Sequence, residues 1–124
     1  MKVGVILTSD DVVKLYEAGT YIATELARGN EVVVFVTGRA TLAFAGRSKP
    51  PDTAEVKRMR ELHVMWDELF TAAKPMGVTV IACETASKIF GVAEEDYKRL
   101  GLVDAVSSMY SFLEQVGEGR VVVF

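Results

Sequence analysis

The sequence predicts a three-layer α/β/α sandwich around a mainly parallel sheet of about five strands. Short apolar runs rich in β-branched residues alternate with helical patterns along the whole chain. The run at 31–36 is continuously apolar after Glu31, and the run at 78–83 is apolar except for Thr79, as expected of strands that helices cover on both faces. With 124 residues the chain is expected to form one domain, 1–124, because it is too short to bury two separate cores.

The elements of the amino-terminal half follow from the residues at their ends. The apolar run at 2–7 predicts a strand, and the polar cluster at 8–11 supplies capping side chains for a helix after it. That helix ends at the basic, glycine-containing turn 28–30. Gly19 in its apolar stripe indicates a close approach to a neighbouring element. One helical turn is expected around Leu42, after the second strand.

The segment around 47–75 is a long helical insertion in the predicted fold. Pro50 and Pro51 prevent a helix from crossing that point, so a new helix begins after them. Asp52 as N-cap and Glu55 three residues later predict one helix of about twenty residues. Its apolar side chains exceed what one buried face needs, which indicates a subunit contact. These side chains are Met59, Met65, Trp66, Leu69 and Phe70.

The carboxyl-terminal half continues the alternation of strands and helices. A helix between the last two strands is expected to begin at Ser107 or Ser108, whose hydroxyl would cap it. The remaining elements are a third strand at 78–83, short helical pieces at 86–90 and 94–100, a short fourth strand at 102–106 and a last strand at 120–124.

The composition is that of an ordinary globular protein, with 50% hydrophobic residues, 25% charged residues and a formal net charge of −3. It gives no reason to expect nucleic-acid binding. The apolar part of the amino terminus is too short for a signal peptide or a membrane span, and no later segment is long enough, so no membrane association is expected. A single cysteine cannot form an internal disulfide, which indicates a reducing cytoplasm.

No cofactor and no metal are expected. The first strand lacks a following glycine-rich phosphate loop, and Asp10 and Asp11 at the next helix start would repel a phosphate. His63 is the only histidine, and its place among apolar residues of the insertion indicates a packed or surface residue rather than a base or ligand. One histidine and one cysteine form no metal site without several carboxylates.

Cys83, the only cysteine, allows two interpretations. It lies where the third strand ends and a helix begins, so backbone N–H groups and the positive helix end would favour its thiolate form. The neighbouring Glu84 would oppose this if its side chain turned toward the sulfur. Unpaired cysteines also serve as small buried hydrophobes. From position alone, Cys83 is either a nucleophile or a packing residue.

The stretch ACETASKIFGVAEEDY at 82–97, followed by a short strand, a helix and a terminal VVVF, resembles the DsrE/DsrF-like family of small sulfur-relay proteins of the DsrEFH/TusBCD type. The segments KVGVILTSDD at 2–11 and EVVVFVTGRA at 31–40 also fit the arrangement of strands in that family. The resemblance implies that Cys83 accepts sulfur as a persulfide and hands it to a thiol of a sulfur-carrier protein. It also implies a homo-oligomer, a trimer or hexamer.

As an enzyme, the chain would then be a sulfurtransferase-type persulfide carrier. A peroxidase or disulfide reductase cycle needs a second, resolving cysteine, which the chain does not have. Transfer of a persulfide needs only one thiol on each carrier. Cys83 is therefore the one candidate catalytic residue.

Three further residues are candidates for substrate binding: Arg39, Ser9 and Ser87. Arg39 and Ser9 follow strands of a parallel sheet and so share an edge with Cys83. A guanidinium near the sulfur would stabilise a thiolate or persulfide and guide an anionic donor. Ser87 belongs to the stretch that carries the resemblance. The plainer interpretation of such residues is that they cap helices and shape turns.

Two other functions stay open at this point. In the first, the chain is a non-catalytic binding or assembly subunit of the same fold, in which Cys83 only packs. In the second, it is a flavodoxin-like or nucleotide-binding domain, which the fold alone would allow.

Overall fold

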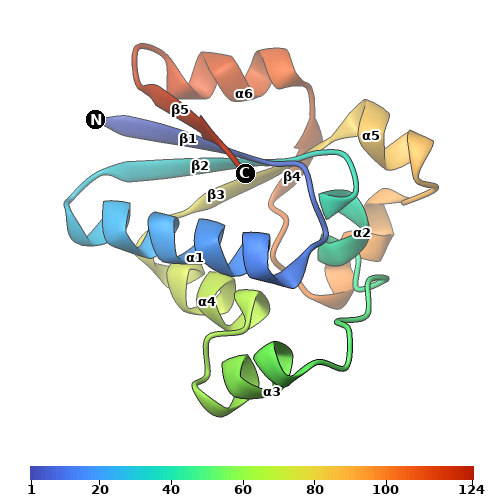
Figure 1. Ribbon diagram of the computed structural model, residues 1–124. Coiled ribbons are helices and arrows are strands. Elements are labelled where there is room, and N and C mark those ends of the chain that lie inside the picture. The colour runs from blue at the N-terminus through green and yellow to red at the C-terminus, as the bar shows by residue number, and fades with distance from the viewer.

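The computed structural model describes residues 1–124 and contains one sheet of five strands, all parallel, in the order β4-β3-β2-β1-β5. The predicted α/β/α fold with a parallel sheet is confirmed, and the structure supplies the strand order (Figure 1). The strands are β1 (Lys2–Leu7), β2 (Glu31–Val36), β3 (Thr79–Cys83), β4 (Ala105–Ser107) and β5 (Arg120–Val123).

Helices cover both faces of the sheet, with α1 and α4 on one face and α6 on the other (Figure 1). From β1 to β4 the chain moves in one direction across the sheet, and the step to β5 reverses that direction. Right-handed connections therefore place the last helix on the opposite face. The helices are α1 (Val12–Ala27), α2 (Ala40–Phe44), α3 (Ala54–Glu61), α4 (Trp66–Ala73), η1 (Lys74–Met76), α5 (Glu84–Ile89), η2 (Glu94–Arg99) and α6 (Met109–Val116).

The two faces carry cores of unequal size. The larger apolar cluster contains 25 buried residues and includes Val32, Val34 and Val36 of β2. The smaller cluster contains five, and Val33 and Phe35 of the same strand belong to it. Successive residues of a strand point to opposite faces, so the continuous apolar run of β2 supplies both cores.

Local signals place several helix ends as predicted. Asp11 caps α1 by accepting a hydrogen bond from the backbone N–H of Lys14, and Ser108 caps α6 in the same way. The turn expected around Leu42 is α2. A Cβ on Gly19 would lie 2.9 Å from Leu69 Cδ1, which confirms the close approach between α1 and α4. No helix is both long and apolar enough to cross a bilayer.

The prediction of one continuous helix in the insertion is wrong. Thr53, rather than Asp52, caps α3 by accepting from the N–H of Val56 at 3.3 Å. The helix then stops at Glu61, and α4 begins at Trp66.

The stop has the hydrogen bonds of a Schellman motif. The N–H of Val64 donates to the carbonyl of Met59 at 3.0 Å, and that of His63 donates to Arg60 at 3.1 Å. His63 adopts the left-handed conformation, with φ of 58°, that glycine normally occupies at this position. Because the motif uses histidine instead of glycine, no stop signal can be recognised at this position from the sequence.

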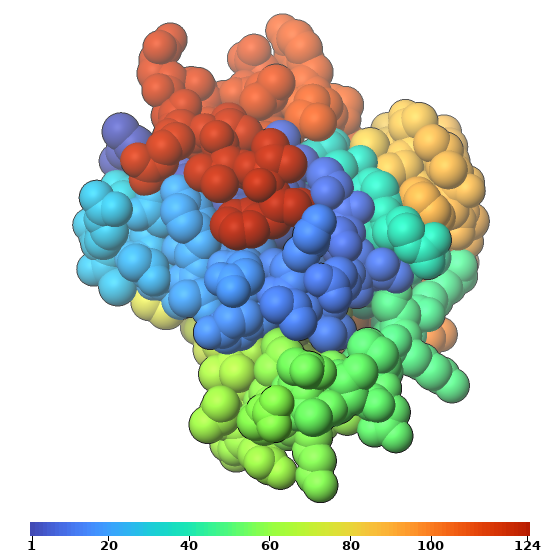
Figure 2. Space-filling model, in the orientation of Figure 1, coloured from blue at the N-terminus to red at the C-terminus, as the bar shows by residue number.

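The apolar surface predicted as a subunit contact is largely internal. Met65, Trp66 and Phe70 are buried, and the ring centroids of Trp66 and Phe70 lie 4.8 and 5.3 Å from that of Phe44. These side chains fill the core under α2 and are not free for another subunit. Several large exposed apolar side chains belong instead to α6 and β5, which form the red surface at the top of Figure 2. They are Met109, Tyr110, Leu113, Val121 and Val123.

A buried carboxylate links α1 to the edge strand β5. Glu25 is 1% exposed, and its carboxylate accepts hydrogen bonds from Arg120 and from the Tyr21 hydroxyl and pairs with Arg28. Burial by itself would raise the pKa of Glu25, but these hydrogen bonds and positive charges outweigh it and hold the pKa below its ordinary value.

Substitutions at His63 test the break between α3 and α4. His63→Gly is expected to leave the free energy of unfolding unchanged or to raise it, whereas His63→Val lowers it by about 1–2 kcal/mol, since a β-branched residue is strained at positive φ. Urea unfolding measures both. In a continuous helix the order would be reversed, because glycine is the weaker helix former.

The Glu25 pair predicts a specific dependence of stability on pH. A lowered carboxyl pKa stabilises the fold above the ordinary value of 4.5, and that contribution is lost as the pH falls through the pKa of folded Glu25. Glu25→Gln is therefore expected to be less stable than wild type at pH 7, with a difference that narrows below about pH 4.5. Urea unfolding across pH measures the difference, and the exposed Glu17→Gln is the matched control. A difference independent of pH would contradict this account.

Candidate functional site

Cys83 is the last residue of β3 and the N-cap of α5, as predicted for a strand-to-helix junction. Its side chain is neither fully buried nor fully exposed. One side of it packs against the smaller core, which contains Phe35, Ile81 and Phe112. The backbone N–H of Ala86 donates to the Cys83 sulfur at 3.4 Å. The residue is therefore partly exposed, and its sulfur receives a polar contact from the first turn of α5.

A chain of hydroxyl groups fixes the backbone at Cys83. The Ser87 hydroxyl donates to the Cys83 carbonyl at 2.7 Å and lies 2.6 Å from the Tyr97 hydroxyl. Ser87 has one proton to donate, so Tyr97 donates to Ser87. Both side chains are buried, at 4% and 3% exposed. This chain holds the end of β3, α5 and η2 together.

The Tyr97 hydroxyl keeps its proton in this environment. Burial raises the pKa of Tyr97, the hydrogen bond with Ser87 opposes that rise, and the charges of Cys83 and Asp96 add to it. The pKa therefore lies above its ordinary value. Tyr97 is a hydrogen-bond donor at neutral pH and takes no part as a base.

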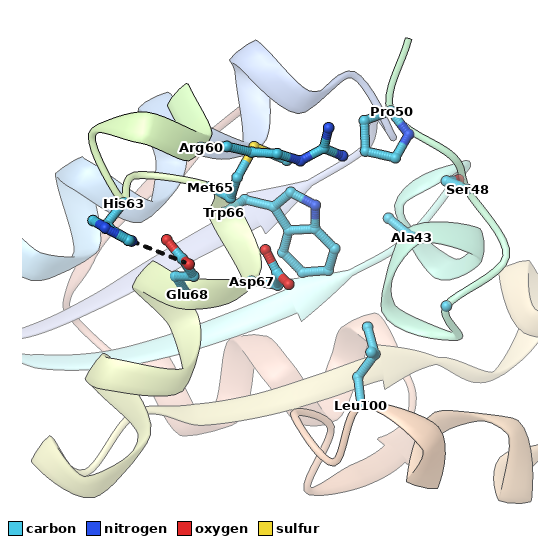
Figure 3. A pocket seen from close by; sticks show the side chains of 11 residues that line it. Ala43, Ser48, Pro50, Arg60, His63, Met65, Trp66, Asp67, Glu68 and Leu100 are labelled. Atoms are coloured by element: carbon cyan, nitrogen blue, oxygen red, sulfur yellow. Dashed lines mark ion pairs between the residues drawn. The ribbon is translucent and has the colours of Figure 1, made fainter. Parts of the chain in front are cut away.

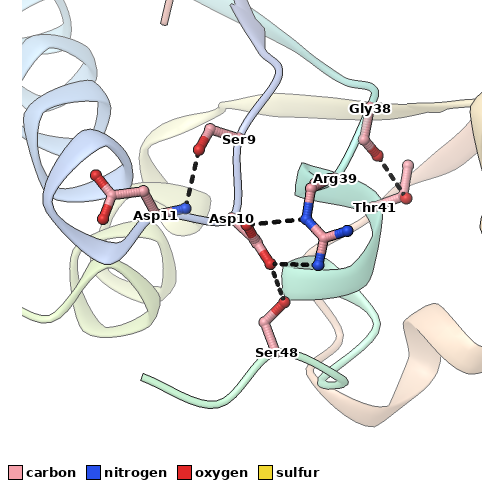
Figure 4. Close-up of polar contacts among 7 residues, drawn as sticks. All are labelled: Ser9, Asp10, Asp11, Gly38, Arg39, Thr41 and Ser48. Atoms are coloured by element: carbon pink, nitrogen blue, oxygen red, sulfur yellow. Dashed lines mark hydrogen bonds and ion pairs between the residues drawn. The ribbon is translucent and has the colours of Figure 1, made fainter. Parts of the chain in front are cut away.

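Arg39 forms an ion pair with Asp10 and does not contact the Cys83 sulfur through a hydrogen bond. Its guanidinium contacts both carboxylate oxygens of Asp10 at 3.4 Å, and the Ser48 hydroxyl donates to the same carboxylate at 3.0 Å (Figure 4). Burial alone would raise the pKa of Asp10, but these partners lower it below its ordinary value. The guanidinium also lies 5.9 Å from the centre of the Phe90 ring, just after α5. No hydrogen bond or ion pair joins Arg39 to Cys83.

Ser9 shapes the turn before α1. Its hydroxyl accepts from the N–H of Asp11 at 3.0 Å (Figure 4). This contact is the turn role that such residues commonly have. Of the three candidate substrate-binding residues, only Ser87 forms a hydrogen bond with Cys83.

His63 is exposed, and one acidic side chain lies near it. Its Nδ1 is 3.8 Å from a Glu68 oxygen. No group of three or more histidine, cysteine or acidic side chains is arranged to hold a metal ion.

Comparison with known proteins identifies the family. The model of the DsrE/DsrF-like family matches residues 1–124, the whole chain. The chain belongs to the DsrE/DsrF-like family. A comparison with curated proteins found no significant match.

Two solved structures share the fold of this DsrE/DsrF-like protein. One is a conserved protein of unknown function, BT1422 from Bacteroides thetaiotaomicron, with a TM-score of 0.63 and 18% identity over 99% of this chain and 94% of that one. The other is a protein of unknown function, MTH1491 from Methanobacterium thermoautotrophicum, with a TM-score of 0.65 and 16% identity over 99% and 98% of the two chains. At these identities the likeness concerns the fold alone.

An open cavity of about 400 Å³ adjoins the Cys83 region of the DsrE/DsrF-like fold. It begins at Glu84 and Ser87 and extends between α5, η2 and β4. Lys88 supplies a positive charge there, and its amino group is 3.6 Å from a Glu84 oxygen. The cavity leaves space for a small group to approach α5 from the side of β4.

Sequence reasoning missed two contributors to this region. The first is Tyr97, for which the sequence holds no signal of its own. A serine four residues after Cys83 does indicate a hydroxyl hydrogen bond back to the Cys83 carbonyl, and Tyr97 is the partner of that serine. Arg47 was not singled out, and it donates to the Gly91 carbonyl at 2.9 Å and pairs with Asp96 at 2.8 Å. It links the start of the insertion to the segment after α5.

The hydroxyl chain predicts a coupling between Ser87 and Tyr97. Ser87→Ala leaves the buried Tyr97 hydroxyl without a partner and is expected to cost about 1–3 kcal/mol in the free energy of unfolding. Adding Tyr97→Phe removes that hydroxyl and should recover part of the loss. Urea unfolding measures the cycle, and the exposed Thr85→Ala is the control on the same helix. Strictly additive losses would contradict the coupling.

Proposed function

We propose that this DsrE/DsrF-like protein is a persulfide carrier that accepts and passes on sulfane sulfur through Cys83. The observation that supports it most is the position of Cys83, a partly exposed residue at the carboxyl end of a parallel strand, with a backbone N–H directed at its sulfur. Ligands of open α/β sheets bind at this edge. The family of the whole chain supports the same chemistry.

The proposed transfer needs no oxidant or reductant. The Cys83 thiolate attacks the outer sulfur of a donor persulfide, a new S–S bond forms on Cys83, and the donor leaves as a thiolate. In the second step the thiolate of a sulfur-carrier protein attacks the outer sulfur of the Cys83 persulfide, and Cys83 leaves as a thiolate. Both steps are thiol exchanges at sulfane sulfur, so one cysteine on each protein suffices. The activity is that of a sulfurtransferase-type carrier.

The surrounding residues support distinct parts of this proposal. Arg39 is exposed and follows β2, the neighbour of β3, but its guanidinium is paired with Asp10, so an anionic donor would have to compete with that carboxylate for it. Ser87 holds the Cys83 carbonyl and so orients the sulfur. The exposed apolar side chains of α6 and β5 offer a surface for the homo-oligomer that the family implies. We place this activity in the cytoplasm, where thiols stay reduced.

A second candidate is a non-catalytic assembly subunit with a structural cysteine. The contact of Cys83 with the smaller core and its role as N-cap of α5 favour it. In that case the thiol would react slowly, and substitution of Cys83 would affect stability alone.

Mass spectrometry after incubation with inorganic polysulfide tests the relay. We expect wild-type protein to gain the mass of one or more sulfur atoms at Cys83, a gain that dithiothreitol reverses, while Cys83→Ser gains none. A second thiol protein added afterwards should remove the sulfur from Cys83. Absence of an adduct on folded wild-type protein would exclude the relay and favour the structural cysteine.

A further inference from the structure

A second cavity, of about 490 Å³, lies apart from the end of β3 that carries Cys83. It is formed by the chain after α2, the end of α3 and the start of α4 (Figure 3). Its size is in the range of small-molecule sites. The lining residues are Ala43, Gly46, Ser48, Pro50, Arg60, His63, Met65, Trp66, Asp67, Glu68 and Leu100.

Trp66 presents an unpaired donor to this cavity. The side chain is only 7% exposed, and its indole N–H donates no hydrogen bond within the chain. Every fully buried side-chain nitrogen or oxygen has a partner, so the unpaired N–H must belong to the small part of Trp66 that is open. In Figure 3 the indole nitrogen faces the side on which Arg60 and Pro50 lie. The indole N–H of this largely buried side chain thus lies at the open side of the cavity and has no acceptor within the chain.

Further donors come from the start of α4 and from α3. The N-cap of α4 is Met65, which offers no side-chain acceptor, and the N–H groups of Trp66, Asp67 and Glu68 have no partner within the chain. Free N–H groups at the start of a helix attract a carboxylate. The Arg60 guanidinium forms no ion pair and lies on the side of the indole nitrogen (Figure 3). The cavity lining thus holds three kinds of hydrogen-bond donor, and the first turn of α4 also carries the carboxylates of Asp67 and Glu68.

The same cavity carries acceptors for a positive charge. Asp67 forms no ion pair, and Glu68 contacts only His63, at 3.8 Å. One arginine against two carboxylates gives the lining a net charge of −1 with His63 neutral, which disfavours a multiply charged anion such as phosphate. A zwitterion satisfies both sets of groups. Leu100 and the Trp66 ring leave an apolar surface beside them.

We propose that this cavity binds a free α-amino acid with an apolar side chain. The ligand carboxylate accepts hydrogen bonds from the Trp66 indole, Arg60 and the first N–H groups of α4. The ligand ammonium lies against Asp67 and Glu68, and the ligand side chain packs toward Leu100. The proposal is independent of the sulfur relay, because no lining residue belongs to the end of β3.

Trp66 is the only tryptophan, so intrinsic fluorescence of the full chain reports on the cavity directly. L-leucine is the probe, with N-acetyl-L-leucine, which lacks the ammonium, and L-leucinamide, which lacks the carboxylate, as matched compounds. We expect leucine to change the Trp66 emission saturably and to bind at least about tenfold more tightly than either blocked compound. Isothermal calorimetry under the same conditions detects binding that leaves the emission unchanged.

Arg60→Gln tests the hydrogen-bond donors, and Arg58→Gln is its control, because Arg58 is an exposed arginine of the same helix that does not line the cavity. Arg60→Gln should weaken leucine binding about tenfold or more, and Arg58→Gln should leave it unchanged. Cys83→Ser should bind leucine like wild type, which separates this site from the relay. The proposal is overturned if leucine gives neither a saturable emission change nor calorimetric heat at millimolar concentration. Equal binding of leucine and its blocked forms, or an unaltered affinity in Arg60→Gln, overturns it equally.

Discussion

The parallel register of β1, β2 and β3 is the constraint on which the candidate site depends. Leu7 pairs with Val36, and Val36 pairs with Ala82, so the three strands end at the same level of the sheet. The polar residues that follow β1 and β2, and Cys83 at the end of β3, must therefore lie along one edge. Strand ends in an antiparallel arrangement would have placed neighbouring segments at opposite edges.

The surroundings of Cys83 follow from how β3 ends. Cys83 has a paired strand neighbour only on β4, where it faces Ser107, because the pairing of β2 with β3 stops at Ala82. The smaller core covers one side of the side chain, and β4 has only three residues. The buried hydroxyls of Ser87 and Tyr97 meanwhile hold the backbone beneath that side chain in one conformation.

Polar contacts connect the insertion to this edge. Ser48 bonds to Asp10 in the turn after β1, and Arg47 bonds to the segment that follows α5. Partly exposed pairs of this kind contribute little to stability, about 0–1 kcal/mol, so their effect here is mainly one of position. They set the direction in which the chain leaves α2 and thereby the wall of the cavity that Trp66 lines.

How much the sequence predicts depends on the distance over which each signal acts. The five strands, a helix cap within 8–11, a cap at Ser107 or Ser108 and the strand-to-helix junction at Cys83 were all predicted, since periodicity and capping involve residues within about four positions of one another. The stop at His63 is also local, but its signal is normally a glycine, and histidine at this position gives none.

Only the tertiary structure decides which distant groups meet. Glu25 and Arg120 are 95 residues apart, and they pair because the strand order brings β5 beside β1, next to α1. Glu25 is a charged residue among the buried apolar residues of α1, which indicates that it has a buried partner of opposite charge. The pattern of α1 does not identify that partner. Arg39 likewise pairs with Asp10 and not with the sulfur, because the turn after β1 brings the Asp10 carboxylate within hydrogen-bond distance of the guanidinium. Local sequence patterns are thus enough to predict the elements and the edge that holds Cys83. The partner of each charged side chain depends on long-range packing, because it is set by which strands lie side by side.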